Sequence, residues 1–438
     1  MQTRRDHVQA YQFAMGRLAS ALVSGDPGRG DSPTRRSALG SVFGVGLVVL
    51  LCAGFGVYGL ISPVAKDDWR KDGAVVLEED TGTRYVYADG VLRPIRNYAS
   101  ALLIAGERTK PETVSAKSLA GVPHSTPVGI EGAPDTVPEA SALAVGAWAR
   151  CLAGAGPTGK GTAGKAAAAA GQTLVFGSRA ARLAPLPDDR QVLLTGPKGV
   201  RYLLLRGVKY PVPGDATLVA LGLDDQAALH ATADWLADLP TGAALAAPTP
   251  ADAGKPAGEV AGHSAVVGEV FRTSTGTTEH YYLMRSDGLA LVNATEYALL
   301  AARPGAPAPR QVGQTDIAAA PVSADRSTGR VPDLSAVRAL DGDTVCVTST
   351  GGRARITVGA PGRGGIVLLP GGGVLAVPGG GRTEYLITEQ GLKYRIADEA
   401  AARALGFDTS RRRLTLPAGV LALVPDGPVL SRTAAAKG

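Results

Sequence analysis

The chain has 438 residues, of which 45% are hydrophobic but only 5% aromatic, so a core would consist mainly of Val, Leu, Ile and Ala. This length accommodates two or three ordinary domains. The net charge of +6 is spread thinly along the chain, which argues against a nucleic-acid-binding protein because such proteins concentrate their basic residues.

The first predicted element is a helix from Arg4 to Ser24, ended by Gly25-Asp26-Pro27. Its apolar residues recur at intervals of three and four, which predicts one narrow apolar seam made of Val8, Tyr11, Met15, Leu18 and Leu22. A lone helix of this length is marginally stable in water. We therefore expect the seam to contact another subunit, the membrane surface or copies of itself; the pattern is compatible with all three.

The second predicted element is a membrane span. No charged residue and no histidine occurs from Ser37 to Ala65. Within this stretch, Leu39–Ile61 consists mostly of Val, Leu, Gly and Phe, and a bilayer requires about 20 such residues. The apolar run is longer than the roughly 7–15 residues of a signal peptide, so we expect an uncleaved anchor over residues 37–65.

The charges on either side of the span predict its orientation. Residues 1–36 hold six Arg against three Asp, whereas residues 66–80 hold three Lys or Arg against six Asp or Glu. Because Lys and Arg concentrate on the cytoplasmic side, with Arg35 and Arg36 directly before the span, the N-terminus is predicted inside. The domains would be a cytoplasmic helix and basic linker (1–36), the anchor (37–65) and an extracytoplasmic domain (66–438).

The outer part contains two cysteines, Cys151 and Cys346, since Cys52 lies in the predicted span. In a compartment that permits oxidation the two are natural partners in a disulfide. The alternative is a pair of unbonded buried thiols.

The outer part also contains four similar segments, near residues 71–106, 193–223, 266–302 and 375–407. Each reads as a strand, a turn, a second strand and an Ala-rich helix, and each turn holds a glycine that suits the positive φ of a tight hairpin: Gly90, Gly207, Gly288 and Gly391. A unit this small cannot bury its own apolar face. We therefore expect an α+β fold, in which one N-terminal transmembrane helix precedes an elongated domain of four β-hairpin/helix repeats. These would surround a central β-rich region formed by the segments containing 108–155 and 331–350.

The segment GAGPTGKGTAGK, Gly154 to Lys165, is similar to a phosphate-binding loop. Such a loop requires Ser or Thr after its Gly-Lys, but Gly161 follows Lys160 and Ala166 follows Lys165. The five histidines show no metal-binding spacing, and no nucleophile-elbow motif occurs. The sequence therefore predicts no catalytic residues, no metal and no cofactor, and it favours a structural role while leaving enzymatic activity open.

The ordered set of motifs resembles the EccB subunit of actinobacterial type VII (ESX) secretion systems. The N-terminal RRDHVQAYQFAMGRLASALVSGDP, followed by two arginines and one span, is its most specific element. VGIEGAPDTVP (128–138), DWLADLPTGAAL (234–245) and LALVPDGPVLS (421–431) are similar to further family segments. The resemblance covers nearly the whole chain and departs from the family in longer connectors, 154–171 and 303–330.

The resemblance implies a structural subunit of an inner-membrane translocation complex. The implied partners are EccC, EccD and EccE, with a mycosin protease as a further candidate and with other copies of the chain in a homo-oligomer. The FtsK-like ATPase EccC would supply the energy. Some EccB members are labelled ATPases, so an extracytoplasmic ATP-binding hydrolase is one alternative function, and a single-span cell-wall-binding or sensor protein is another.

Overall fold

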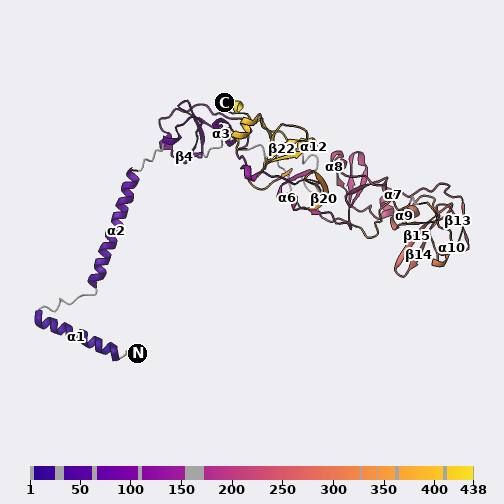
Figure 1. Ribbon diagram of the computed structural model, residues 1–438, viewed down its shortest axis with the longest axis horizontal. Helices are drawn as coiled ribbons and strands as arrows, with labels where there is room; N and C mark the ends of the chain where they lie inside the picture. Colours follow the sequence, from indigo (N-terminus) through magenta and orange to yellow (C-terminus); the bar gives the residue numbers. More distant parts are fainter. Residues whose placement is uncertain are drawn as a thin grey trace. The chain divides into compact units, whose positions relative to one another are not determined.

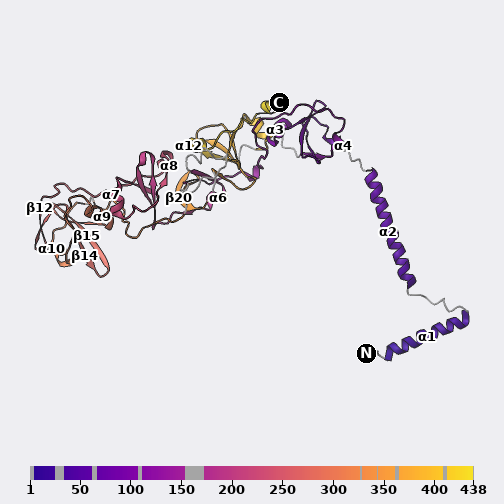
Figure 2. The same ribbon diagram turned by 180° about the vertical axis from the view of Figure 1, so that it is seen from behind.

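The computed structural model describes residues 4–24, 34–61, 67–106, 111–152, 172–325, 328–342, 344–360, 365–407 and 412–437. The chain divides into two compact units, Met1–Asp68 with Val114–Ala120, and Trp69–Thr113 with Gly121–Gly438. The second unit is called the repeat domain below. Figures 1 and 2 show the ribbon from opposite sides.

The first unit contains two long helices, α1 (Arg4–Ser24) and α2 (Thr34–Ile61), drawn in indigo in Figure 1. Asp6 lies in the first turn of α1, where a carboxylate interacts favourably with the helix dipole. The predicted helix over residues 4–24 is confirmed with the same bounds. The helix α2 begins before the predicted span and includes Arg35 and Arg36.

The repeat domain contains four repeats with one topology, in which three antiparallel strands precede a helix and a short fourth strand. Repeat one comprises β1 (Val75–Glu78), β2 (Arg84–Ala88), β3 (Val91–Pro94), α3 (Tyr98–Ala105) and β4 (Glu112–Val114). Repeat two comprises β8 (Arg190–Thr195), β9 (Arg201–Leu205), β10 (Val208–Val212), α7 (Asp215–Leu221) and β11 (Leu229–His230). Repeat three comprises β14 (Val270–Thr275), β15 (Thr278–Arg285), β16 (Gly288–Val292), α9 (Ala294–Ala301) and β17 (Arg310–Gln311). Repeat four comprises β22 (Gly373–Pro378), β23 (Tyr385–Thr388), β24 (Lys393–Arg395), α11 (Glu399–Ala404) and β25 (Arg413–Leu416).

The strand orders of the four sheets are β3-β2-β1-β4, β10-β9-β8-β11, β16-β15-β14-β17 and β24-β23-β22-β25, with β18 (Arg338–Ala339) added beside β8. The fourth strand runs parallel to the first in repeats two, three and four. All four predicted turn glycines have a positive φ, for example 78° at Gly90 and 135° at Gly288. Residues with a Cβ atom rarely adopt a positive φ, which explains why each turn has a glycine.

A fifth, six-stranded sheet has the order β21-β6-β5-β19-β20-β7. Its members are β5 (Trp148–Leu152), β6 (Gln172–Phe176), β7 (Ala184–Pro185), β19 (Thr344–Thr350), β20 (Arg353–Gly359) and β21 (Ile366–Val367). We call it the central sheet. Cys151 and Cys346 lie directly opposite each other on the two middle strands, with 3.9 Å between their Cα atoms, and they form a disulfide.

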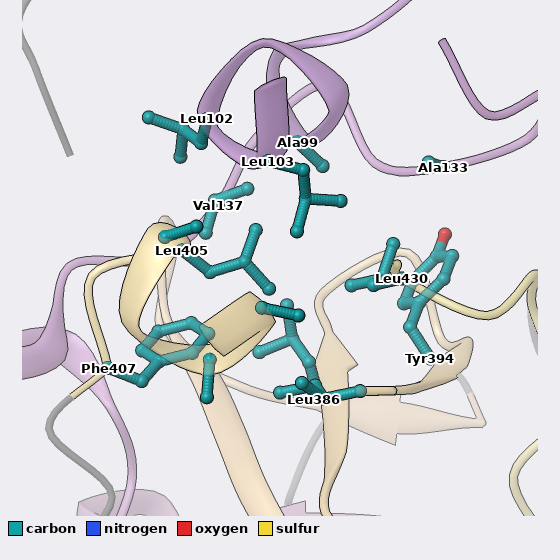
Figure 3. Close-up of a cluster of buried hydrophobic side chains, with 14 of the residues drawn as sticks. Ala99, Leu102, Leu103, Ala133, Val137, Leu386, Tyr394, Leu405, Phe407 and Leu430 are labelled. Atoms are coloured by element: carbon teal, nitrogen blue, oxygen red, sulfur yellow. The ribbon is translucent and has the colours of Figure 1, made fainter. Parts of the chain in front are cut away.

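Separate clusters of buried apolar residues join the four repeats and the central sheet. Repeats one and four share a core in which Leu102 and Leu103 of α3 face Leu405 and Leu386 (Figure 3). Repeats two and three share another core. One end of the central sheet packs against repeat two, and the other end packs against repeat four.

The C-terminal residues also contact repeat one. The Arg432 Nε atom donates a hydrogen bond to the carbonyl oxygen of Leu103, at 3.2 Å, and Figures 1 and 2 both place the C-terminus beside α3. The remaining elements are short: α4 (Ala116–Leu119), α6 (Ser178–Ala181), α8 (Ala233–Ala237), β12 (Pro256–Val260), β13 (His263–Val266), α10 (Gln314–Ala319), α12 (Ala418–Ala422), α13 (Arg432–Ala435) and the 3₁₀ turns Asp67–Trp69, Ala140–Ala142 and Pro197–Gly199.

The predicted fold class is confirmed as a mixed α+β protein with one apolar N-terminal helix and four repeats around a β-rich centre. The structure adds to it, because each repeat has an extra strand before the predicted hairpin and a short strand after the helix.

Candidate functional site: anchor and assembly surfaces

The helix α2 has the length and composition of a membrane span. Its window Gly40–Tyr58 has 19 residues with a mean hydropathy of 2.2, and none of it is buried inside the structure. At about 1.5 Å per residue, such a helix matches the roughly 30 Å of a bilayer's hydrocarbon core. Large apolar side chains such as Phe43 and Phe55 are exposed on it, which would be unfavourable in water. A bilayer would remove this surface from water.

The apolar seam of α1 is also uncovered. Its five residues are each more than half exposed, from 51% at Met15 to 82% at Leu22. Phe13 and Val23 are exposed as well, but they lie off the seam, and at about 100° per residue Phe13 is on the opposite side of the helix. Sequence periodicity missed these two residues because they lie outside the three-four spacing. In this structure the apolar seam of α1 is exposed to solvent.

The other predicted residues differ in burial, and some lie outside the described residues. Arg35 and Arg36 lie in α2, but their side chains are outside the described part of the chain. The cysteines Cys151 and Cys346 are fully buried in the central sheet, and Cys52 is exposed on α2. The segment Gly154–Lys165, with its phosphate-loop-like sequence, lies outside the described residues.

No catalytic constellation is found among the residues that the structure describes. They include no group of three or more His, Cys, Asp and Glu residues able to hold a metal ion. The shifted pKa values have structural causes. Hydrogen bonding to Glu279 raises the pKa of Tyr281 to about 12, whereas hydrogen bonds from Ser323 and Ala324 lower the pKa of Asp287.

The carboxyl group of Glu384 has a different environment. Burial raises its pKa, and the neighbouring Arg413 guanidinium opposes that effect. The two side chains form an ion pair at 2.5 Å. This arrangement joins the residue before β23 to β25 within repeat four and contains no nucleophile, so it is a structural ion pair.

Surface cavities lie beside charged residues at two places in the described part of the chain. A cavity of about 410 Å³ lies between repeats one and four, where Arg84 lies 3.8 Å from Asp135 and its guanidinium lies 5.8 Å from the ring centre of Tyr98. A second, of about 780 Å³, lies in repeat three beside Arg310, whose guanidinium is bound by Glu269 and by the carbonyl oxygen of Val260. In these cavities Arg84 and Arg310 are already paired with carboxylates. We identify no general acid and general base placed to act on a bound substrate in either cavity.

Comparison with known proteins points in one direction. The family model for the type VII secretion system ESX-1 transport transmembrane domain B, EccB, matches residues 1–360 and 349–438. The ESX-1 secretion system ATPase EccB1 of Mycolicibacterium smegmatis (strain MKD8) is 26% identical and covers 99% of this chain and 94% of its own length. The ESX-3 secretion system ATPase EccB3 of Mycolicibacterium smegmatis (strain ATCC 700084 / mc(2)155) is 27% identical over 98% of this chain and 89% of its own length.

Two solved structures share the fold. A chain of the intact ESX-5 inner membrane complex is 24% identical, with a TM-score of 0.53 over 99% of this chain and 95% of that chain. A chain of the periplasmic assembly from the ESX-5 inner membrane complex is 22% identical, with a TM-score of 0.57 over 85% of this chain and 98% of that chain. Because the family model runs through both the anchor and the repeat domain, this chain belongs to the EccB family of type VII secretion proteins.

Proposed function

We propose that the chain is a structural, membrane-anchored component of a type VII (ESX) secretion complex, in which a partner ATPase supplies the energy. The observation that carries this proposal is the family match, which includes the α1 seam, the apolar helix α2 and all four repeats.

The proposed topology places residues 1–36 in the cytoplasm, residues 37–65 in the membrane and residues 66–438 outside. It is supported by the excess of arginine in residues 1–36 and of carboxylates in residues 66–80. The similar chain from a periplasmic ESX-5 assembly agrees with an outer location of the repeat domain. Protease added to intact spheroplasts should digest the repeat domain and spare the tail before α2; the opposite pattern would reverse this topology.

The proposed partners are the other ESX membrane subunits, EccC, EccD and EccE, with a mycosin protease as a further candidate and with other copies of this chain. One similar solved chain is part of an intact inner membrane complex, which supports assembly with other subunits. We propose that the apolar seam of α1 packs against a partner helix, because five exposed apolar side chains on one helix would otherwise face water.

Copurification tests the proposal. The tagged full-length chain is extracted from native membranes in a mild detergent, and the bound proteins are identified by mass spectrometry. Other ESX membrane subunits should be recovered, whereas a tagged single-span protein of unrelated function should not recover them. If the tagged chain brings down none of these subunits, the proposal is wrong.

Nucleotide hydrolysis is a second candidate function, because the two curated relatives described above are named ATPases. Lys160 and Lys165 would be the cationic residues of such a site, by their position in the phosphate-loop-like segment. ATP turnover by the purified chain that disappears in Lys160→Ala would favour this function. If the purified chain does not hydrolyse ATP, or if Lys160→Ala hydrolyses it at the same rate, the result would argue against a nucleotide site in this segment. A partner ATPase would then supply the energy.

A further inference from the structure

The two faces of the central sheet are covered by different parts of the chain. On β19, Val345 and Val347 pack in the core that joins the sheet to repeat two, whereas Cys346 between them packs in a separate cluster with Ala180 of α6. We call this second side the disulfide face. The helix α6 has four residues, Ser178–Ala181, and a helix of that length spans only about 6 Å. It can therefore cover only part of the disulfide face.

Two arginines of β20 lie on the disulfide face. Ile356 and Val358 pack in the core beside repeat two. Because side chains alternate between the two faces of a sheet, Arg353 and Arg355 lie on the other side, about 7 Å apart along the strand. Both are exposed, as is Ala354 between them. This end of β20 therefore presents two positive charges at the spacing of alternate residues in an extended chain.

The segment that contains α6 adds two further arginines. Arg179 lies in α6 and Arg182 directly follows it, and both are exposed. The chain then reaches β7, where Ala184 lies opposite Val358 of β20, so this segment crosses the disulfide face from β6 to β20. Figures 1 and 2 both place α6 beside β20. Four exposed arginines thus lie on or beside this part of the disulfide face.

No described carboxylate forms an ion pair with any of these four arginines. The buried Arg150 of the same sheet, by contrast, is paired with Asp238. The acidic residues closest to the four arginines in the chain are Asp188 and Asp189, which follow β7 and are exposed. Positive charge that its own chain does not compensate attracts and orients an anionic partner.

The same part of β20 has an uncovered strand edge. β20 pairs with β19 over its whole length, whereas β7 pairs only with Thr357 and Val358 on the other edge. The amide of Leu186 donates to the carbonyl oxygen of Ile356 at 3.1 Å. Backbone groups of alternate residues point the same way, so those of Ala354 also point away from β19. No described residue bonds the N–H or the carbonyl oxygen of Ala354, which leaves both groups open to a further strand.

We propose that this edge of β20 receives an acidic, extended segment of a partner protein. The segment pairs with the open backbone groups of Ala354, and its alternate side chains place carboxylates opposite Arg353 and Arg355. An added strand carries side chains on one face at the same spacing of about 7 Å, and directly opposite charges stabilise a strand pair. Main-chain hydrogen bonds then supply affinity, and the alternating charges supply specificity.

The charges of this edge also decide against a second β20 as the occupant. Charged side chains on an edge strand prevent unwanted pairing, because two copies of the edge would bring arginines together. The same charges admit a strand with carboxylates at alternate positions. A flat anionic surface such as a bilayer would use the arginines but not the backbone groups of Ala354, so the two kinds of partner respond differently to a change at that residue.

The test measures how a fluorescent peptide of alternating threonine and glutamate binds the full-length chain in nonionic detergent, by anisotropy at low ionic strength. Arg353→Ser with Arg355→Ser should weaken binding about tenfold. Ala354→Pro should weaken it as well, although no charge changes, because proline has no N–H to offer; the N–H that it removes does not bond β19, so the sheet should be preserved. The matched control is Arg382→Ser with Arg395→Ser, which removes two exposed arginines of repeat four and should leave binding unchanged.

A charge-reversed variant keeps the test decisive if Ala354→Pro disturbs the fold. Arg353→Glu with Arg355→Glu should lose the acidic peptide and bind a peptide of alternating threonine and lysine. Equal binding of a peptide of the same composition with all its glutamates in one block would overturn the proposal, as would an equal loss in the repeat-four control. Binding to phosphatidylglycerol vesicles that depends on the arginines, together with peptide binding that Ala354→Pro leaves intact in a folded chain, would assign the surface to a bilayer instead.

Discussion

Trp235 donates a hydrogen bond from Nε1 to the carbonyl oxygen of Arg150, at 3.2 Å, and so joins repeat two to the central sheet. The Arg150 guanidinium makes two further contacts with repeat two. It donates a hydrogen bond to the carbonyl oxygen of Asp234 at 3.1 Å and forms an ion pair with the carboxylate of Asp238. The Arg150 side chain is only 3% exposed. A buried guanidinium requires such partners, since removing a charge from water is costly.

The first prediction concerns this ion pair. Asp238→Ala leaves the buried Arg150 guanidinium with less compensation and should lower the free energy of unfolding by about 1–3 kcal/mol, measured by denaturant titration. The loss is modest because the Asp238 carboxylate is 40% exposed, so water can replace part of its contribution. Asp234→Ala is the matched control, because Asp234 contacts Arg150 through its backbone carbonyl only. A loss of the same size in both variants would contradict the assignment.

The second prediction concerns the glycines that face tyrosine rings in repeats two and four. A methyl group at Gly242 would lie 2.4 Å from the ring of Tyr210, and one at Gly427 would lie 2.4 Å from the ring of Tyr394. Gly242→Ala and Gly427→Ala should each reduce stability by about 1–3 kcal/mol through overpacking, seen as a lower Tm. Gly214→Ala is the control, since a methyl group there meets no atom within 4 Å. A Tm equal to that of the control would refute this packing.

The sequence predicted those elements that are determined by residues close together in the chain. The helix α1, the apolar run of α2 and the positive-φ glycines such as Gly90 each follow from residues within a few positions of one another. The first strand of each repeat was missed because short apolar runs such as Val75–Glu78 have no clear alternation and resemble either a strand or a buried helix. The contact between Arg150 and Trp235 was missed because nothing local links residues 85 positions apart.

The third prediction concerns the disulfide. The Cys151–Cys346 bond closes a loop with a sequence separation of 195, so its loss should cost about 2–5 kcal/mol of stability. The double variant Cys151→Ser/Cys346→Ser should therefore unfold at a lower temperature than the unaltered chain in non-reducing buffer. Adding a reductant should lower the Tm of the unaltered chain and leave that of the double variant unchanged. Cys52→Ser should change neither value, because Cys52 lies outside the repeat domain.

The fourth prediction concerns the pH dependence of Tyr281. Its hydroxyl donates to Glu279 at 2.6 Å, and the nearby carboxylate disfavours the phenolate, which raises the pKa to about 12 from the usual 10. Because the folded state holds the proton more tightly, the associated stability is present below pH 10 and is lost as the pH rises toward 12. Glu279→Gln should lower the pKa of Tyr281, measured by phenolate absorbance relative to a Tyr281→Phe background. Glu259→Gln is the control, and an equal shift in it would contradict the assignment.

The fifth prediction concerns the apolar seam of α1. Replacing Met15 and Leu18 by Asp places two charges on the exposed apolar face and should prevent α1 from packing against a partner helix, because burying an unpaired carboxylate is costly. The variant should stay in the membrane, since α2 is unchanged, but should recover fewer ESX subunits in copurification. Gln9→Asp with Gln12→Asp is the matched control, because these residues lie off the seam and add the same charge. If the seam variant and the control recover equal amounts of partner, α1 does not assemble through its seam, and the interaction must come from α2 or the repeat domain.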